Sequence, residues 1–175
     1  MIKVAEWGTG MMGQGLLRYM LDRPNQIDLC GVIVTNPAKE GMTVGELLGR
    51  PCDVRMTTDF ESVLAQRPDV VCVNTQSNLH EVEPQIVPAI KAGCNVICIA
   101  EKLAYPWASD PERADLFDRI AKENDVSCLG TGINPGFVLD ALIVMWSSIC
   151  LRVDSIEASR VNDLSPFGPT VINGQ

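Results

Sequence analysis

The sequence predicts an α/β fold with a doubly wound parallel sheet, followed by the start of a second, α+β domain. Two observations support this fold class. Short β-rich segments alternate with amphipathic ones, as in βαβ units, and several β-rich segments are almost wholly apolar, as a sheet covered on both faces requires. At 175 residues the chain has room for one core and a small appendage. We therefore expect one domain over residues 1–150 and the beginning of a truncated substrate or oligomerisation domain over residues 151–175.

Six segments are expected to be strands, because apolar and β-branched residues dominate each of them. In chain order they are residues 2–6, 29–35, 54–56, 69–74, 95–100 and 126–129. Between the first two, an apolar stripe predicts a helix that Pro24 ends. The stripe consists of Met12, Leu16, Leu17, Met20 and Leu21.

Three further helices are expected to begin where Ser or Thr is followed three residues later by Glu, because the two side chains then bond free amides of the first turn. The pairs are Thr43 with Glu46, Thr58 with Glu61, and Ser109 with Glu112. The helix that begins near Ser109 has an apolar stripe and is expected to end at Asn124. The stripe consists of Leu116, Phe117, Ile120 and Ala121.

A stripe of apolar residues also predicts a helix that Gly93 ends. The stripe consists of Val82, Ile86, Ala89 and Ile90. Pro84 fits the first turn of this helix, whereas Pro88 is expected to kink or shorten it. A last apolar helix is expected over residues 137–150, and the apolar positions at Val153, Ile156 and Val161 resemble the first strand of a further domain.

Composition excludes several classes of protein. The net charge of −8 and the pI of about 4.6 argue against a nucleic-acid partner, which requires a basic face. No apolar run is long enough to span a bilayer, and the start of the chain shows no export signal, so we expect a cytoplasmic protein with no membrane partner. The seven cysteines are scattered, and four of them lie in predicted buried strands, as is typical of reduced thiols; their spacing predicts no metal site.

The clearest motif is a glycine-rich turn between the first strand and the first helix. It consists of Gly8, Thr9, Gly10, Met11, Met12 and Gly13. The first glycine permits a tight turn, the second allows backbone amides to approach a diphosphate, and the third allows helix and strand to pack closely. In this context the motif predicts a Rossmann fold that binds a nicotinamide dinucleotide.

The residues that follow the second strand indicate which dinucleotide is preferred. An NAD-selective site usually places an acidic residue about 20 positions beyond the turn, on the ribose 2′-hydroxyl. This chain has Thr35, Asn36 and Lys39 there instead. Short polar side chains with a nearby cation suit a 2′-phosphate, so we expect NADP to be preferred, with NAD also possible. The alternative is that Lys39 is an ordinary solvated lysine of a loop.

Four segments carry a resemblance to known oxidoreductases. Residues 74–80 and 95–103 resemble the glucose-fructose oxidoreductase and inositol dehydrogenase pattern, although Leu103 replaces a proline. Residues 101–107 and 130–137 look more like the 2,4-diaminopentanoate dehydrogenase group, which is related to dihydrodipicolinate reductase. In that group a second acid is expected where Lys102 stands.

The resemblance implies a reductase or dehydrogenase acting at an amine or imine carbon. Its small-molecule substrate would be an amino acid or a cyclic imine. The resemblance also implies a second, sheet-containing domain that carries much of the substrate site and the contacts of a homo-oligomer. The 175-residue chain alone is then expected to bind cofactor without turnover. Two alternatives remain: a stand-alone dinucleotide-binding or redox-sensing module, and a sugar or polyol dehydrogenase of the glucose-fructose type.

Ligands of an open α/β sheet gather at the carboxyl ends of its strands, and this rule selects the remaining candidates. Thr75 and Gln76 are expected to meet the nicotinamide ribose, or else to cap the next helix. Asn134 is expected to reach the carboxamide or the substrate, or else to serve a structural turn.

The same rule selects Glu101 and Lys102 as catalytic candidates. Lys102 would stabilise developing negative charge or donate a proton, and Glu101 would partner it or meet a substrate amine. The alternative is a surface ion pair between these two residues. His80, the single histidine, begins a predicted helix, and we expect it to be a capping or otherwise hydrogen-bonded structural histidine rather than a general acid.

Overall fold

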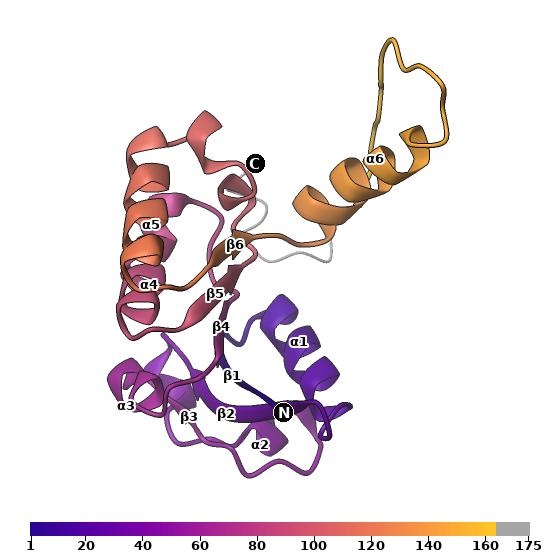
Figure 1. Cartoon of the computed structure of the whole chain (residues 1–175). Coiled ribbons are helices and arrows are strands. Elements are labelled where there is room, and N and C mark those ends of the chain that lie inside the picture. Colours follow the sequence, from indigo (N-terminus) through magenta and orange to yellow (C-terminus); the bar gives the residue numbers. More distant parts are fainter. Residues whose placement is uncertain (164–175) are drawn as a thin grey trace.

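The structure is a computed structural model, and it describes residues 1–163. A six-stranded parallel sheet forms its centre, in the order β3-β2-β1-β4-β5-β6 (Figure 1). The strands are β1 (Ile2–Trp7), β2 (Ile27–Ile33), β3 (Met56–Thr57), β4 (Val70–Val73), β5 (Asn95–Cys98) and β6 (Cys128–Gly130). The predicted doubly wound parallel sheet is confirmed, and each strand overlaps a predicted segment, with ends shifted by at most two residues.

The order of the strands reverses at β1. The chain runs outward from β1 to β2 and β3 on one side, then returns to β4, β5 and β6 on the other. In open α/β sheets, the crevice outside the carboxyl ends of the strands at such a reversal is where ligands bind. The segments that follow β1 and β4 are therefore the natural place for a site.

Helices cover the two faces of the sheet unequally. They are α1 (Met11–Leu21), α2 (Val44–Leu48), α3 (Phe60–Leu64), α4 (Leu79–Lys91), α5 (Pro111–Glu123) and α6 (Leu142–Ser147). Residues of α1 and α2 form apolar clusters on one face, and residues of α3, α4 and α5 share a larger cluster on the other. Ile97 of β5 and Leu129 of β6 pair in register and are 38% and 52% exposed, so the α1 face is open at that end of the sheet.

Helix α4 runs through both of its prolines. Pro84 lies in the second turn rather than the first, and the helix continues past Pro88 to Lys91, so the expected shortening is wrong. A proline inside a helix removes a hydrogen bond. Burial of the opposite face offsets that cost, because the apolar side chains of the predicted stripe are completely buried.

One of the three predicted helix starts is confirmed, and two are displaced by one residue. Thr43 and Glu46 form the full capping box at α2. The cap of α3 is Asp59 rather than Thr58, and the cap of α5 is Asp110 rather than Ser109. In both cases an aspartate directly follows the predicted Thr or Ser, and its carboxylate accepts a hydrogen bond from an amide of the first turn.

The last described segment leaves the body of the molecule. A π-helical segment, η4 (Ile133–Ala141), has non-helical backbone at residues 134–136 and continues into α6, which projects away from the sheet (Figure 1). Helix α6 ends at Ser147, three residues before the predicted end. No residue from 132 to 163 is buried, and residues 151–163 contain no strand. The strand expected near Val153 is therefore wrong for the described residues, because no described strand lies beside it to share hydrogen bonds. The remainder of the predicted second domain, residues 164–175, lies outside the described residues.

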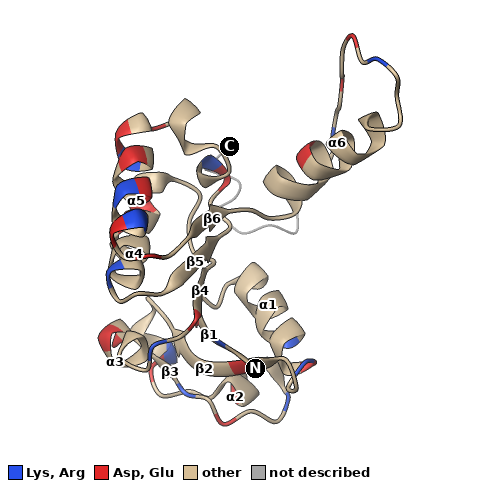
Figure 2. Ribbon diagram, in the orientation of Figure 1, with Lys and Arg blue, Asp and Glu red and all other residues tan. Residues whose placement is uncertain are grey.

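Helix α5 carries charged side chains on its solvent side. Figure 2 shows acidic and basic residues along the outer side of α5, where Arg119 pairs with Glu123 and Lys122 pairs with Asp118. No helix among residues 1–163 is long and apolar enough to cross a membrane.

Candidate functional site

The turn between β1 and α1 can be built only with glycine at two of its positions. Gly8 has a φ of +118°, and a Cβ atom there would lie 2.5 Å from the carbonyl oxygen of Asn74. A Cβ atom on Gly13 would lie 2.1 Å from the carbonyl oxygen of Gly8. Any side chain at either position would therefore push the turn off the sheet.

Gly10 differs from these two because the protein itself does not require it. Its φ is −72°, and nothing lies within 4 Å of the place where a Cβ atom would stand. The space above its backbone is open to a ligand. The three glycines thus have the geometry that the sequence predicts for a tight turn, an approach to a diphosphate and a close helix contact.

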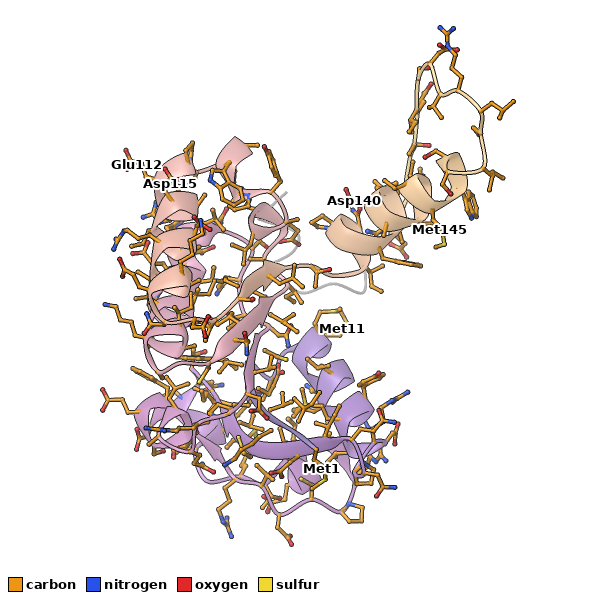
Figure 3. The ribbon with its side chains drawn as sticks, in the orientation of Figure 1. Met1, Met11, Glu112, Asp115, Asp140 and Met145 are labelled. Carbon is orange, nitrogen blue, oxygen red and sulfur yellow. The ribbon has the colours of Figure 1, made fainter. Side chains whose placement is uncertain are left out.

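The first turn of α1 can attract an anion. Gly10 caps the helix without a side-chain hydrogen bond, and the first turn contains no acidic residue. Free amides and the positive end of the helix dipole therefore remain available to a negatively charged group. Met11 and Met12 are exposed at this position, and Figure 3 labels Met11 at the start of α1.

Lys39 lies against the glycine turn rather than in solvent. Its Nζ atom donates to the carbonyl oxygen of Thr9 at 3.1 Å and to the Thr9 hydroxyl at 2.9 Å. Thr35 and Asn36, which follow β2, are exposed, and the Asn36 side chain accepts a hydrogen bond from the amide of Ala38. The structure thus brings the predicted cation to the turn, and it gives Asn36 a local capping contact.

Beneath the turn lies a buried acid that the sequence analysis did not select. Glu6 of β1 is completely buried, and its Oε1 atom accepts a hydrogen bond from Asn74 Nδ2 at 2.6 Å. Burial raises the pKa of Glu6 well above its ordinary value, and the hydrogen bond from Asn74 opposes this effect more weakly. The available signal was an acidic residue between the apolar residues Ala5 and Trp7, near the end of a predicted buried strand.

Thr75 is fixed by a second residue that the sequence analysis missed. Its hydroxyl donates to Oε1 of the buried Gln85, on α4, at 2.6 Å. Its methyl group lies 2.9 Å from the position of a Cβ atom on Gly8. Helix α4 is capped at Asn78, so neither Thr75 nor the half-buried Gln76 serves as its cap.

His80 does not cap the helix either. It is the second residue of α4, and its side chain is exposed. The expectation that it serves helix capping is therefore wrong. The cap position falls two residues earlier, at Asn78.

Glu101 and Lys102 begin the short 3-10 helix η2 (Glu101–Leu103), which follows β5. Glu101 is half-buried and Lys102 is exposed. No ion pair joins them among residues 1–163, so the alternative of a mutual surface pair is not realised there. The amide of Lys102 donates to the carbonyl oxygen of Ser77 at 3.5 Å, which ties the segments after β4 and β5 together.

Asn134 lies in the irregular turn after β6. The amide of Thr131 donates to the carbonyl oxygen of Cys98 at 3.0 Å and joins this segment to β5. Further along, the amide of Gly136 donates to Asp140 Oδ2 at 2.7 Å, and Figure 3 labels Asp140 on the projecting segment. Asn134 itself is half-buried. Asp140, which closes this turn, is a further residue that the sequence analysis did not select.

The candidate residues thus follow the carboxyl ends of β1, β2, β4, β5 and β6. Contacts between backbone atoms and between side chains join adjacent segments, so the glycine turn, Thr75, η2 and the Asn134 turn share one edge of the sheet. This arrangement offers an anion site at α1 and acidic, basic and amide groups beside it. It is the layout that a dinucleotide and a small polar substrate require.

Comparisons with known proteins agree with this layout. The model of the oxidoreductase family with an NAD-binding Rossmann fold matches residues 2–131, and the model of the 2,4-diaminopentanoate dehydrogenase C-terminal domain matches residues 137–175. A 2,4-diaminopentanoate dehydrogenase of Acetoanaerobium sticklandii is 37% identical, over 99% of this chain and 50% of that protein. The resemblance predicted from the sequence is confirmed.

Two further proteins are similar to the chain. An amine dehydrogenase of Streptomyces virginiae is 33% identical, over 95% of this chain and 48% of that protein. The solved amine dehydrogenase from Mycobacterium smegmatis superposes with a TM-score of 0.80 at 28% identity, over 87% of this chain and 45% of that one. The chain therefore spans about half the length of the curated relatives that it matches.

Proposed function

Because this chain belongs to the oxidoreductase family with an NAD-binding Rossmann fold, we propose that it is the cofactor-binding part of a dehydrogenase acting at an amine or imine carbon. The observation that carries the proposal is the glycine turn, in which only glycine fits at Gly8 and Gly13, and Gly10 leaves open space at the start of α1, where no side chain caps the helix. The names of the two curated relatives, a diaminopentanoate dehydrogenase and an amine dehydrogenase, support the amine substrate.

Residues 1–150 are the dinucleotide-binding domain in this proposal, and residues 151–175 begin a domain that completes the substrate site. The lack of buried side chains from residue 132 to 163 supports a further domain that would cover this segment. The 175-residue chain then binds cofactor but does not turn over an amino acid or a cyclic imine. Finding steady-state turnover with the 175-residue chain alone would contradict the division.

NADP is the preferred cofactor in this proposal, and NAD is a weaker alternative. Lys39 already lies at the turn, and neither Thr35 nor Asn36 carries the acid that would repel a 2′-phosphate. We expect NADPH to bind more tightly than NADH in a fluorescence titration. Lys39→Met is expected to weaken the binding of NADPH about tenfold and the binding of NADH much less, because only NADPH has the extra phosphate.

A matched control for Lys39 is Lys122→Met, which removes an exposed lysine on α5. This variant should leave both affinities unchanged. Tenfold tighter binding of NADH than of NADPH by the unaltered chain would refute the preference. If Lys39→Met lowered the affinity for both dinucleotides equally, Lys39 would contact the diphosphate that they share instead of the 2′-phosphate.

The catalytic residues in this proposal are Glu101 and Lys102. The bound nicotinamide supplies a hydride acceptor or donor at its C4 atom. Glu101, half-buried at the end of β5, binds the nitrogen of the substrate amine, and Lys102 stabilises negative charge that develops beside it. Thr75, Gln76 and Asn134 hold the ribose and carboxamide from the neighbouring segments.

The catalytic roles are tested in a full-length, active form of the protein. Glu101→Gln and Lys102→Met keep the approximate shape of each side chain and remove its charge. We expect both to lower kcat by at least tenfold. Unchanged kcat and KM in either variant would dismiss the role of that residue.

The assembly proposed for the full-length protein is a cytoplasmic homo-oligomer. The exposed apolar side chains of α6, Val144, Met145 and Trp146, support a surface that meets other protein. All seven cysteines are free thiols, which suits a reducing compartment. Light scattering of the full-length protein tests the assembly, and a single monomeric species would contradict it.

A further inference from the structure

Glu6 has an unusual environment for an acid. Its neighbours across the sheet are Val32 of β2 and Cys72 of β4, and its own exposure is 0%. One carboxyl oxygen, Oε1, accepts from Asn74 Nδ2 at 2.6 Å. The other, Oε2, is buried and has no hydrogen-bond partner among the described residues. An unpaired buried oxygen is costly, so a purely structural role would favour an apolar side chain here.

The acid lies directly under the glycine turn. A Cβ atom on Gly13, the third residue of α1, would be 3.0 Å from Glu6 Oε1. The hydrogen-bond partner of Glu6, Asn74, contacts the turn as well, because its carbonyl oxygen lies 2.5 Å from the Cβ position of Gly8. Glu6 and Asn74 therefore lie against Gly13 and Gly8, the two positions of the turn where only glycine fits.

Among residues 1–163, no ion pair joins a basic side chain to Glu6. From β4 the group that faces it is the Cys72 thiol, whose pKa burial raises to about 12. Val32 faces it from β2 and Gly13 from α1, and neither titrates. Lys39, the cation at the turn, bonds to Thr9. Burial raises the pKa of Glu6, so the carboxyl group keeps its proton to a higher pH than an exposed glutamate does.

We propose that Glu6 is a positioning residue that supports the diphosphate turn as an uncharged carboxylic acid, and that losing its proton weakens dinucleotide binding. This inference rests on the proposed function, in which the turn binds a dinucleotide. A negative charge below the first turn of α1 cancels part of the positive potential that the helix presents to a diphosphate. Since linkage is reciprocal, a bound dinucleotide also holds the proton on Glu6.

The test is the affinity of the 175-residue chain for NADH and NADPH between pH 6 and pH 10, measured by fluorescence. In the unaltered chain both dissociation constants are expected to rise at least tenfold towards pH 10. Glu6→Gln imitates the protonated acid, so its affinity at pH 6 should match that of the unaltered chain and change little with pH. Glu83→Gln, an acid of α4 paired with Arg113, is the matched control and should keep the full pH dependence.

Asn74→Ala gives a second, independent variant. It removes the hydrogen bond that lowers the pKa of Glu6, so the loss of affinity should move to higher pH. The inference is overturned if the unaltered chain binds both dinucleotides equally well at every pH, or if Glu6→Gln keeps the same pH dependence. Should Glu6→Gln not fold, an unshifted profile in Asn74→Ala overturns it. If no dinucleotide binds at any pH, the proposed function itself fails.

Discussion

At the scale of single residues, the glycines of the turn have separate purposes, and two substitutions distinguish them. Gly13→Ala places a methyl group 2.1 Å from a backbone carbonyl oxygen, so we expect it to lower the free energy of unfolding by about 3 kcal/mol. Gly10→Ser adds a side chain in open space at a helix cap that favours serine. We expect this variant to stay as stable as the unaltered chain and to lose at least tenfold in NADPH affinity.

Urea denaturation and fluorescence titration measure the two effects separately. The interpretation of Gly10 as the position of ligand approach is wrong if Gly10→Ser binds NADPH normally. A stable Gly13→Ala would show that the turn can move away from β1, contrary to the close contact in the structure.

Glu6 also predicts how stability depends on pH. Its pKa in the folded chain is raised above the ordinary value of 4.5, so the stability present below about pH 4.5 is lost as pH rises towards the folded pKa. Glu6→Gln removes this loss. At pH 8 we expect Glu6→Gln to have a higher free energy of unfolding than the unaltered chain, by about 1.4 kcal/mol for each unit by which the pKa of Glu6 is raised. Parallel stability curves for the two proteins from pH 4 to pH 9 would contradict the shift.

At the scale of elements, the displaced helix cap of α5 can be tested with neighbouring residues. The Asp110 carboxylate accepts from the amide of Arg113 at 3.2 Å and also pairs with its side chain. Ser109, which the sequence favoured as the cap, bonds carbonyl oxygens instead. We expect Asp110→Ala to lower the thermal midpoint by a few degrees and Ser109→Ala to leave it nearly unchanged. If Ser109→Ala lowered the thermal midpoint more than Asp110→Ala did, Ser109 would be the cap, as the sequence predicts.

The sequence predicted the elements well because their signals are local. Alternation of strands and helices, the apolar stripe of α4 and the capping box at Thr43 each depend on spacing within one segment. Helix ends were harder, because Ser109 and Asp110 are adjacent residues that both favour the cap position, and spacing alone does not rank them. The effect of Pro88 was misjudged for another reason. The hydrogen bond that the proline removes is offset by burial of the apolar face of α4 against the sheet, and this packing is not part of a local sequence pattern.

The candidate site was predictable only in part. The glycine turn, Thr75, Glu101 and Asn134 follow strands, so the rule for parallel sheets brings them to one edge. The residues that support them do not follow such a rule. Gln85 reaches Thr75 from the second turn of α4, and Asp140 closes the Asn134 turn from the projecting segment. These contacts depend on how elements pack, which one sequence does not reveal.

At the scale of the whole molecule, stability comes from the sheet and its covering helices rather than from the projecting segment. Phe117 of α5 is 3% exposed in the main cluster, whereas Trp146 of α6 is 66% exposed. We expect Phe117→Ala to lower the free energy of unfolding by about 3 to 5 kcal/mol and Trp146→Ala to change it by less than about 0.5 kcal/mol. Urea denaturation of the two variants measures both values. A large loss in Trp146→Ala would show that α6 belongs to the same folding unit.

The close contact between Gly13 and Gly8 has a consequence for the kinetics of the molecule. The amide of Gly8 is bonded to Ile33 in β2, so the turn is anchored on the sheet before any ligand arrives. A loop that is already ordered does not have to close during an encounter. Association should then be a single step whose observed rate rises in proportion to ligand concentration, without the plateau that a slow rearrangement imposes.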